Sequence, residues 1–307
     1  MPIRRTSNQS SQDTGFYNPE VYSDVGSRSI NTLWTPVYIN TDLWLDASDT
    51  TTITTVGSGV SQWDDKSGKN RNFVQATGVL QPVTNSSSLN NLNVLTFASS
   101  YVKSNSTNST WTFLHNTSKS SVFFVIRPGL VSNPDVSYGL LGTDGGTVLR
   151  PGMYVRFDDR QAFSYDNSVL SVSATTQFAT NINLLETSPS GVLPANNWNI
   201  LGVELNLGSV VASGRCVHYV NGIPFPSSNT YNTSLSNVTP STSLEIGSAG
   251  SGVWPLFGNI AEVVIISGAL SSGNRQLTEG YLAWKWGLVS GLAAGHPYKN
   301  SPPYASI

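Results

Sequence analysis

Charged residues and cysteine are scarce in this sequence. Only 11% of its 307 residues are charged, and the formal net charge is −2. The chain therefore lacks the basic excess that would hold nucleic acid and the basic amphipathic helix that would lie on a membrane. Its single cysteine, Cys216, excludes an intramolecular disulfide and a cysteine-based zinc site. Because Cys216 lies in an apolar run, we expect it to be a buried small hydrophobic residue.

Long apolar runs and catalytic signatures are also missing. No run approaches the ~20 apolar residues that a membrane-spanning helix needs, and residues 1–12 lack the apolar core of a secretory signal. Neither His-Glu-x-x-His nor Gly-x-Ser-x-Gly occurs. Glu204, Glu245 and Glu262 each stand alone in a predicted strand, whereas a retaining glycosidase needs two carboxyl groups about 5 Å apart. The sequence predicts that the protein is not an enzyme.

Ser, Thr, Asn and Gly dominate instead, and eight tryptophans are present. This composition is typical of an all-β protein with polar turns. Asn221-Gly222 between two apolar runs indicates a β-hairpin, while residues 164–195 show little apolar periodicity and predict long surface loops. Strands of this number and spacing favour a β-sandwich over a parallel α/β sheet. The main predicted strands are residues 43–46, 94–97, 122–127, 138–142, 153–158, 198–207, 215–220 and 244–247.

The strongest predicted strand is residues 260–267. Nearly every residue in it is apolar, so we expect both of its faces to be covered. Glu262 interrupts the run, and an unpaired buried carboxylate would be costly. Glu262 must therefore be paired, hydrogen-bonded or at the mouth of a site. Since no partner carboxylate is evident elsewhere, we interpret it as a hydrogen-bonded sheet residue.

One short C-terminal helix follows that strand. Ser271 or Ser272 can cap its first turn, and Leu277, Tyr281 and Trp284 recur at helical spacing on one stripe. We expect these three side chains to seal a sheet edge or one end of the core. A glycine inside the helix, at position 280, indicates that its backbone lies close against a sheet.

Several segments together resemble a known family. They are LWLDASDTTTI, SGVSQWDDKSGKNRNFVQ, NVLTF, VFFVIR, HYVNG, LEIGS and GNIAEVVIISGALSSGNRQLTEGYLAWKWGL. In this order they resemble the concanavalin A-like lectin/glucanase superfamily, and more narrowly the laminin G-like jelly-roll domains of phage virion proteins. The resemblance covers residues 34–297 and implies an all-β, two-sheet antiparallel jelly-roll sandwich. The paired-carboxylate strand of the glucanases is absent, and such a fold alone does not decide function.

The resemblance leaves the N-terminal segment uncovered. Residues 1–32 are polar and lack periodicity, so we expect an extended N-terminal arm before a jelly-roll domain at residues 33–307. Two interpretations stay open for the arm. It is either a disordered terminus or an assembly arm that becomes ordered against a partner subunit.

One loop has the composition of a calcium site. Asp64, Asp65, Ser67, Asn70 and Asn72 place hard oxygen ligands close together, as calcium prefers, and members of this superfamily often hold calcium. Calcium is the one cofactor that the sequence suggests. The alternative is a tight turn in which Asp65 caps backbone amides.

Two aromatic residues are candidates for carbohydrate binding. Lectin sites stack a sugar ring on an aromatic face and satisfy its hydroxyls with polar groups. Trp111 and Tyr165 lie in variable loops and are the better candidates. Trp63 and Trp254 lie in segments that the family shares, so we expect structural roles for them.

From the resemblance we expect a multicopy or homo-oligomeric virion protein on the surface of a phage particle. It would be a decoration, head-fibre or tail-fibre component that binds host-surface carbohydrate non-covalently. Its arm would dock on other virion proteins, and many copies would convert weak contacts into avidity. One alternative is a capsid cement protein without sugar binding. The less favoured alternative is a polysaccharide-degrading hydrolase.

Overall fold

The computed structural model describes residues 32–114, 119–129, 135–144, 152–160, 169–175, 184–187, 193–194, 196–206, 215–226, 228–232 and 239–305. One compact unit spans Leu33–Ile307. The arm predicted for residues 1–32 lies outside the described residues except for its last position, so it stays a prediction.

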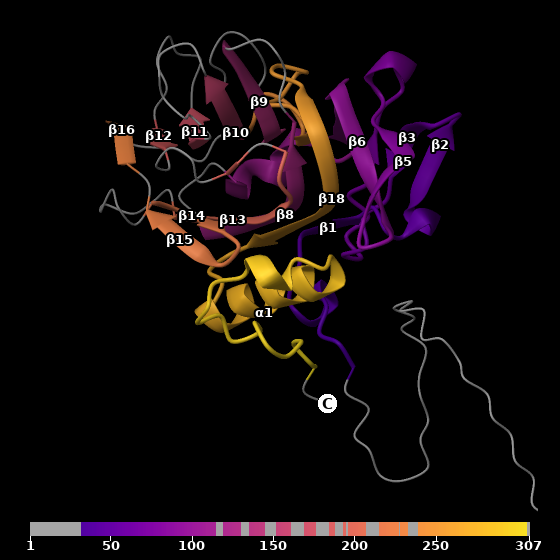
Figure 1. The fold of residues 1–307 in the computed structure, drawn as a ribbon. Helices are drawn as coiled ribbons and strands as arrows, with labels where there is room; N and C mark the ends of the chain where they lie inside the picture. The colour runs from indigo at the N-terminus through magenta and orange to yellow at the C-terminus, as the bar shows by residue number, and fades with distance from the viewer. Residues whose placement is uncertain are drawn as a thin grey trace, which may run out of the picture. The chain divides into compact units, whose positions relative to one another are not determined.

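The strands form a two-sheet antiparallel sandwich, as the sequence predicts (Figure 1). We call the first layer the helix-side sheet. It runs in the order β5 (Val83–Leu89), β6 (Leu92–Ser100), β18 (Leu256–Ser267), β8 (Lys119–Pro128), β13 (Asn199–Asn206), β14 (Cys216–Val220) and β15 (Ile223–Pro226). β1 (Leu43–Asp46) pairs with the second half of β18, beyond the residues that pair with β6.

The second layer, the far sheet, contains the shorter strands. Its order is β2 (Ile53–Val56), β3 (Gly59–Trp63), β4 (Phe73–Val74), β7 (Val102–Ser104), β17 (Glu245–Ile246), β9 (Asp135–Gly142), β10 (Gly152–Arg160), β11 (Val169–Thr175), β12 (Leu184–Thr187) and β16 (Ser228–Asn232). The pair Gly59↔Val83 joins the two sheets through β3 and β5. Short 3₁₀ turns lie at Pro36–Tyr38, Thr50–Thr52, Gly78–Leu80, Asn108–Leu114 and Val289–Gly291.

β18 is covered on both faces, which confirms the interpretation of its apolar run. Val263 and Ile265 join the core between the two sheets. Val264 and Ile266 face the opposite way and join a second apolar cluster under the helix. Because successive side chains of a strand point to opposite faces, a strand buried on both sides must be apolar almost throughout.

Helix α1 (Ser272–Lys285) covers the outer face of the helix-side sheet (Figure 1). The Ser271 hydroxyl caps it by accepting a hydrogen bond from the Asn274 amide at 3.1 Å. Gly287, at φ 69°, follows its last residues, where a left-handed residue commonly ends a helix. The start of the helix matches the Ser271 cap that the sequence predicts.

The way α1 packs corrects two details of the prediction. Tyr281 is buried and Leu277 is partly buried, but against the face of the sheet rather than an edge or core end. Trp284 is only half-buried, and its indole donates to the Tyr298 carbonyl at 2.8 Å. Trp286, two residues on, is the fully buried indole. Helical spacing identifies the apolar stripe of the helix, but it does not show which side of that stripe meets the sheet.

Gly280 has a different neighbour from the one that the sequence predicts. A Cβ at Gly280 would lie 2.7 Å from the Tyr298 side chain. The close approach is therefore made by the C-terminal segment, which crosses the helix, and not by the sheet.

The strands at residues 169–175 and 184–187 contradict the prediction of loops for residues 164–195. β11 pairs with β10 over seven register positions, and β12 pairs with β11. In the sequence of β11, Leu170, Val172 and Ala174 alternate with Ser171 and Ser173. This alternation is a weak strand signal because serine and alanine differ little in hydrophobicity.

The hairpin and the buried cysteine are as predicted. Asn221 and Gly222 take φ values of 53° and 78° between β14 and β15, as a two-residue hairpin with a left-handed turn requires. Cys216 is a buried residue of the core between the sheets. In the described part of the chain, no helix has the length and apolar character to cross a membrane.

Candidate functional site

Trp111 is not a sugar-binding platform, so this prediction is wrong. Its ring is 0% exposed and belongs to the core between the sheets. The indole N–H donates to the Ser243 hydroxyl at 3.2 Å, and the ring contacts Phe73 with centroids 6.2 Å apart. The guanidinium of Arg71 covers it at 5.3 Å from the ring centroid. Tyr165, the other candidate, lies outside the described residues and stays a prediction.

The loop proposed for calcium is organised around the Asp65 carboxylate. Its Oδ1 accepts hydrogen bonds from the amides of Trp44 at 3.0 Å and Ser67 at 2.9 Å. Its Oδ2 accepts from the amide of Arg71 at 3.1 Å and from the Ser67 hydroxyl at 2.8 Å. Both oxygens are thus used to hold the turn, which favours the interpretation of Asp65 as a backbone cap.

The other members of that loop also have local roles. Asn72 Oδ1 accepts from the Asp65 amide at 3.0 Å, and Asp64 Oδ1 accepts from the Gln62 side chain at 2.7 Å. Asn70 takes the left-handed φ of 56°. Among the described residues, no group of three or more His, Cys, Asp or Glu side chains could hold a metal ion. Calcium binding by the loop stays a prediction.

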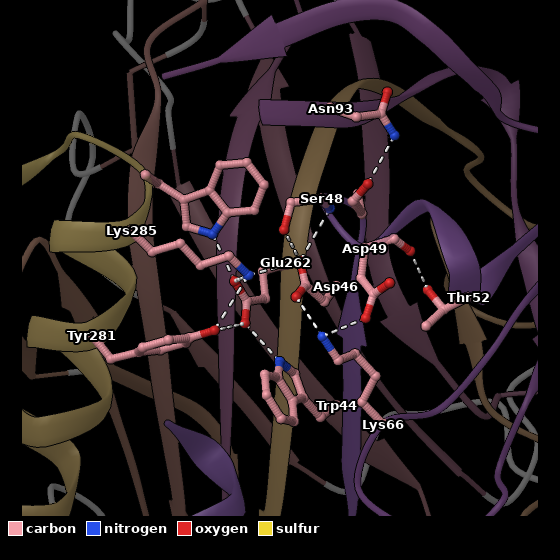
Figure 2. Close-up of polar contacts among 12 residues, drawn as sticks. Trp44, Asp46, Ser48, Asp49, Thr52, Lys66, Asn93, Glu262, Tyr281 and Lys285 are labelled. Atoms are coloured by element: carbon pink, nitrogen blue, oxygen red, sulfur yellow. Dashed lines mark hydrogen bonds and ion pairs between the residues drawn. The ribbon is translucent and has the colours of Figure 1, made fainter. Parts of the chain in front are cut away.

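Glu262 is a fully buried carboxylate held by four donors (Figure 2). Its Oε1 accepts from the Trp44 indole at 2.6 Å and the Tyr281 hydroxyl at 3.0 Å. Its Oε2 accepts from the Trp286 indole at 2.6 Å and from Lys285 Nζ at 2.8 Å. Burial raises the pKa of Glu262, and the charge of Lys285 acts in the opposite direction. Glu262 is a hydrogen-bonded sheet residue with a fully buried side chain.

A second carboxylate, Asp46, lies opposite Glu262 in the β1–β18 pairing (Figure 2). Lys285 Nζ is 2.7 Å from its Oδ1, and Lys66 Nζ is 2.9 Å from its Oδ2. Lys66 also pairs with Asp49 at 2.8 Å. Burial alone would raise the pKa of Asp46, but Lys285 and Lys66 lower it to about 2. Sequence reasoning identified Glu262 as needing partners but found none of them.

An open hollow of about 190 Å³ lies where β8 begins and β13 ends. The pairs Asn206↔Lys119 and Leu205↔Ser120 bring these two strand ends together. The link from β18 to α1 forms another wall. The lining residues are Lys119, Ser120, Ser121, Glu204, Leu205, Asn206, Val217, Gly268, Ala269 and Leu270.

Glu204 lines this hollow and has both a hydrogen-bond donor and a cationic side chain beside its carboxylate. The Tyr219 hydroxyl donates to its Oε2 at 3.1 Å, and Arg275 Nε lies 3.6 Å from its Oε1. The Arg275 guanidinium also stacks 4.1 Å from the Tyr219 ring centroid. Burial raises the pKa of Glu204, and burial together with the Glu204 charge raises the pKa of Tyr219 to about 12. The carboxylate is held in place, yet 28% of its side chain is exposed.

Comparison with known proteins bears on the fold. No family model and no curated protein matches this chain. A structure with the same overall arrangement is the binding domain of botulinum neurotoxin serotype D/C VPI 5993, with 13% identity, a TM-score of 0.50, and coverage of 80% of this chain and 53% of that chain. The likeness shows a shared fold. At this identity it shows nothing of a shared ligand.

Two further solved structures are similar at lower scores. NanB sialidase from Streptococcus pneumoniae (K499G mutant) has 16% identity and a TM-score of 0.41, over 59% of this chain and 26% of that one. The Ruminococcus gnavus IT-sialidase CBM40 bound to α2,3 sialyllactose has 9% identity and a TM-score of 0.39, over 53% and 83%. This chain thus spans about a quarter of the sialidase and about half of the toxin chain.

Proposed function

We propose that this protein binds carbohydrate non-covalently through the hollow between β8, β13 and the β18–α1 link. The observation that carries the proposal is the lining of that hollow. It combines a carboxylate acceptor at Glu204, donors at Lys119 and Asn206, and aliphatic side chains at Val217 and Leu270. A pyranose ring offers the complementary set, since its hydroxyls both donate and accept and its C–H faces are apolar.

The size of the hollow favours one sugar unit rather than a long chain. Pockets for drug-sized ligands begin at roughly 300 Å³, and this hollow measures about 190 Å³. A single shallow site gives weak binding. If the protein is displayed in many copies, several weak contacts made at the same time would give strong overall binding.

The same lining favours binding over hydrolysis. Among the ten described residues that line the hollow, Glu204 is the one carboxylate. Glycoside hydrolysis needs a second carboxyl group on the other side of the scissile bond. Asp46 and Glu262, which do lie close to each other across two strands, are buried beneath α1.

The finer role that we propose is that of a phage particle surface protein, as a decoration, head-fibre or tail-fibre component. The family resemblance of the sequence supports this role, together with the polar residues 1–32 that precede the compact unit. A capsid cement role is the second candidate. It is favoured by two exposed apolar side chains that follow the arm in the sequence, Val37 at 67% and Tyr38 at 52% exposure.

Binding to a glycan array, followed by equilibrium titration, tests the carbohydrate proposal. Glu204→Gln and Asn206→Ala each remove one ligand-facing group. Losing a hydrogen bond to a charged group costs about 1.5–3 kcal/mol, so Glu204→Gln should weaken binding roughly 10- to 100-fold. Asp64→Asn, in the turn around Asp65, is the matched control and should bind normally. Failure of the wild-type protein to bind any surface glycan would reject the proposal.

Two companion assays separate the alternatives. Release of reducing ends from host polysaccharide would indicate a hydrolase. Deleting residues 1–32 should detach the protein from particles under either virion role, whereas only the cement role predicts a loss of particle heat resistance.

A further inference from the structure

We propose that Lys285 and Asp46 react with each other to form an intramolecular amide bond between Lys285 Nζ and Asp46 Cγ, which ties α1 covalently to β1. This inference is independent of carbohydrate binding. It rests on the contact of Lys285 Nζ with Asp46 Oδ1 at 2.7 Å, between side chains that are 10% and 4% exposed (Figure 2). Since Cγ is bonded to Oδ1, the nitrogen is held near the roughly 3–3.5 Å separation at which bound groups react.

The surroundings of the pair favour a neutral product. Two aromatic rings lie beside it, with Lys285 Nζ 5.0 Å from the Trp286 ring and 5.5 Å from the Tyr281 ring, and the Trp44 indole donates to the neighbouring Glu262. Burying an ammonium and a carboxylate costs free energy even when they are paired. An amide would remove both of these charges, and the low exposure of the two side chains limits the access of water, the reactant of the reverse reaction.

Glu262 is placed to move the protons. Its Oε2 lies 2.8 Å from Lys285 Nζ, and burial raises its pKa, which makes it a better base toward the ammonium. Lys66 lies on the other side of Asp46, with Nζ 2.9 Å from Oδ2. Its positive charge offsets the negative charge of the Asp46 carboxylate, which is otherwise a poor electrophile, and stabilises the oxygens of the tetrahedral intermediate.

The step balances without any other reactant. The Lys285 ammonium gives one proton to Glu262 Oε2, and the free amine forms the N–C bond to Asp46 Cγ. One Asp46 oxygen then leaves as water, taking the proton held by Glu262 and a second proton from the nitrogen. One hydrogen stays on the amide nitrogen, and Glu262 returns to its starting state. The net change is –NH₃⁺ plus –COO⁻ to an amide plus one water.

The bond would link two elements that are far apart in the sequence. Asp46 ends β1, the first strand, and Lys285 ends α1, the last helix. A cross-link between distant residues restricts the unfolded chain and so stabilises the folded one. The long loop that this bond closes would keep the helix on the sheet when the protein is heated.

The intact mass of the denatured wild-type protein tests the proposal. The expected mass is that of the sequence, allowing for the initiator methionine, minus one water molecule. Trypsin does not cleave after an acylated lysine, so digestion should give residues 29–66 linked to residues 276–299 as one branched species. Tandem mass spectrometry of that species locates the bond at Asp46 and Lys285.

Two arginine variants provide the control, because arginine keeps the charge but is not a nucleophile. Lys285→Arg should show the full sequence mass, while Lys69→Arg, at an exposed lysine that contacts Asn40 rather than Asp46, should keep the loss of one water. Glu262→Gln should slow formation of the bond in freshly refolded protein. The full mass in aged wild-type protein would overturn the proposal, and this measurement needs no variant to fold. A water loss that persists in Lys285→Arg, or that maps to a linear peptide, would also overturn it.

Discussion

Truncation of Trp286 tests how the helix holds the sheet. Trp286 is 0% exposed, and it packs with Phe123, Val125 and Val264 in the cluster under α1. Replacing a buried Trp by Ala costs about 3–5 kcal/mol. The change also removes the indole donor at 2.6 Å from Glu262, and leaving a buried group short of a partner costs about 1–3 kcal/mol. We expect Trp286→Ala to lower the free energy of unfolding by about 5 kcal/mol.

Trp284 offers a matched control on the same helix. It is half-buried, and its indole donates to the Tyr298 carbonyl rather than to a buried carboxylate. Trp284→Ala should cost about 1–2 kcal/mol, mainly for the lost hydrogen bond and partial burial. Trp286→Phe keeps a six-membered aromatic ring but removes the donor and part of the buried area, so it should fall between the two.

Urea denaturation followed by circular dichroism measures all three variants. A domain of ordinary stability has about 5–15 kcal/mol, so Trp286→Ala should lose at least about a third of the free energy of unfolding. Equal losses for Trp284→Ala and Trp286→Ala would refute the assignment of the sheet-facing side of α1. A Trp286→Phe variant as stable as the wild type would show that the bond to Glu262 contributes little.

Three further perturbations probe other parts of the structure. His218 is buried, and burial lowers its pKa from 6.5 to about 4. As the pH falls, the unfolded chain therefore binds a proton at this histidine before the folded protein does. We expect about 3 kcal/mol of the free energy of unfolding to be lost between pH 6.5 and pH 4. Melting curves of His218→Gln should lack this loss. Gly222→Ala would place a Cβ 2.9 Å from the His296 ring, in a backbone conformation with φ 78°. In Gly57→Ala the new Cβ meets no atom within 4 Å, so that variant has only the backbone strain of about 1–2 kcal/mol. Gly222→Ala should therefore lower the free energy of unfolding by more than Gly57→Ala does. Asp65→Ala should lower the melting temperature equally in calcium and in chelator, whereas a calcium-dependent gain in the wild type alone would establish the loop as a metal site.

Local sequence signals were enough to predict the elements whose surroundings are encoded in their own residues. The two-sided burial of β18 follows from its unbroken apolar run, and the β14–β15 turn follows from Asn221-Gly222. The start of α1 follows from Ser271. In each case the deciding contact is made within a few residues or follows from strand geometry alone.

The site could not be predicted because distant residues build it. The donors to Glu262 come from β1 and α1, and no spacing within the sequence connects Trp44 with Trp286. The hollow is formed by the ends of three strands and one link, so Glu204 stands alone in its strand. Trp111 was misjudged because its polar neighbours, such as Asn108, predict an exposed loop, whereas a 3₁₀ turn carries the ring inward.

The most direct test of the central claim is an NMR titration of the wild-type protein with the strongest ligand found on a glycan array. Carbohydrate binding at the hollow predicts fast-exchange shifts of amides at residues 119–121, 204–206 and 268–270, with little change around Asp65. The same titration of Glu204→Gln should show these shifts only at much higher ligand concentration. Shifts confined to another surface, or unchanged affinity in Glu204→Gln, would contradict the assignment of the hollow as the binding site.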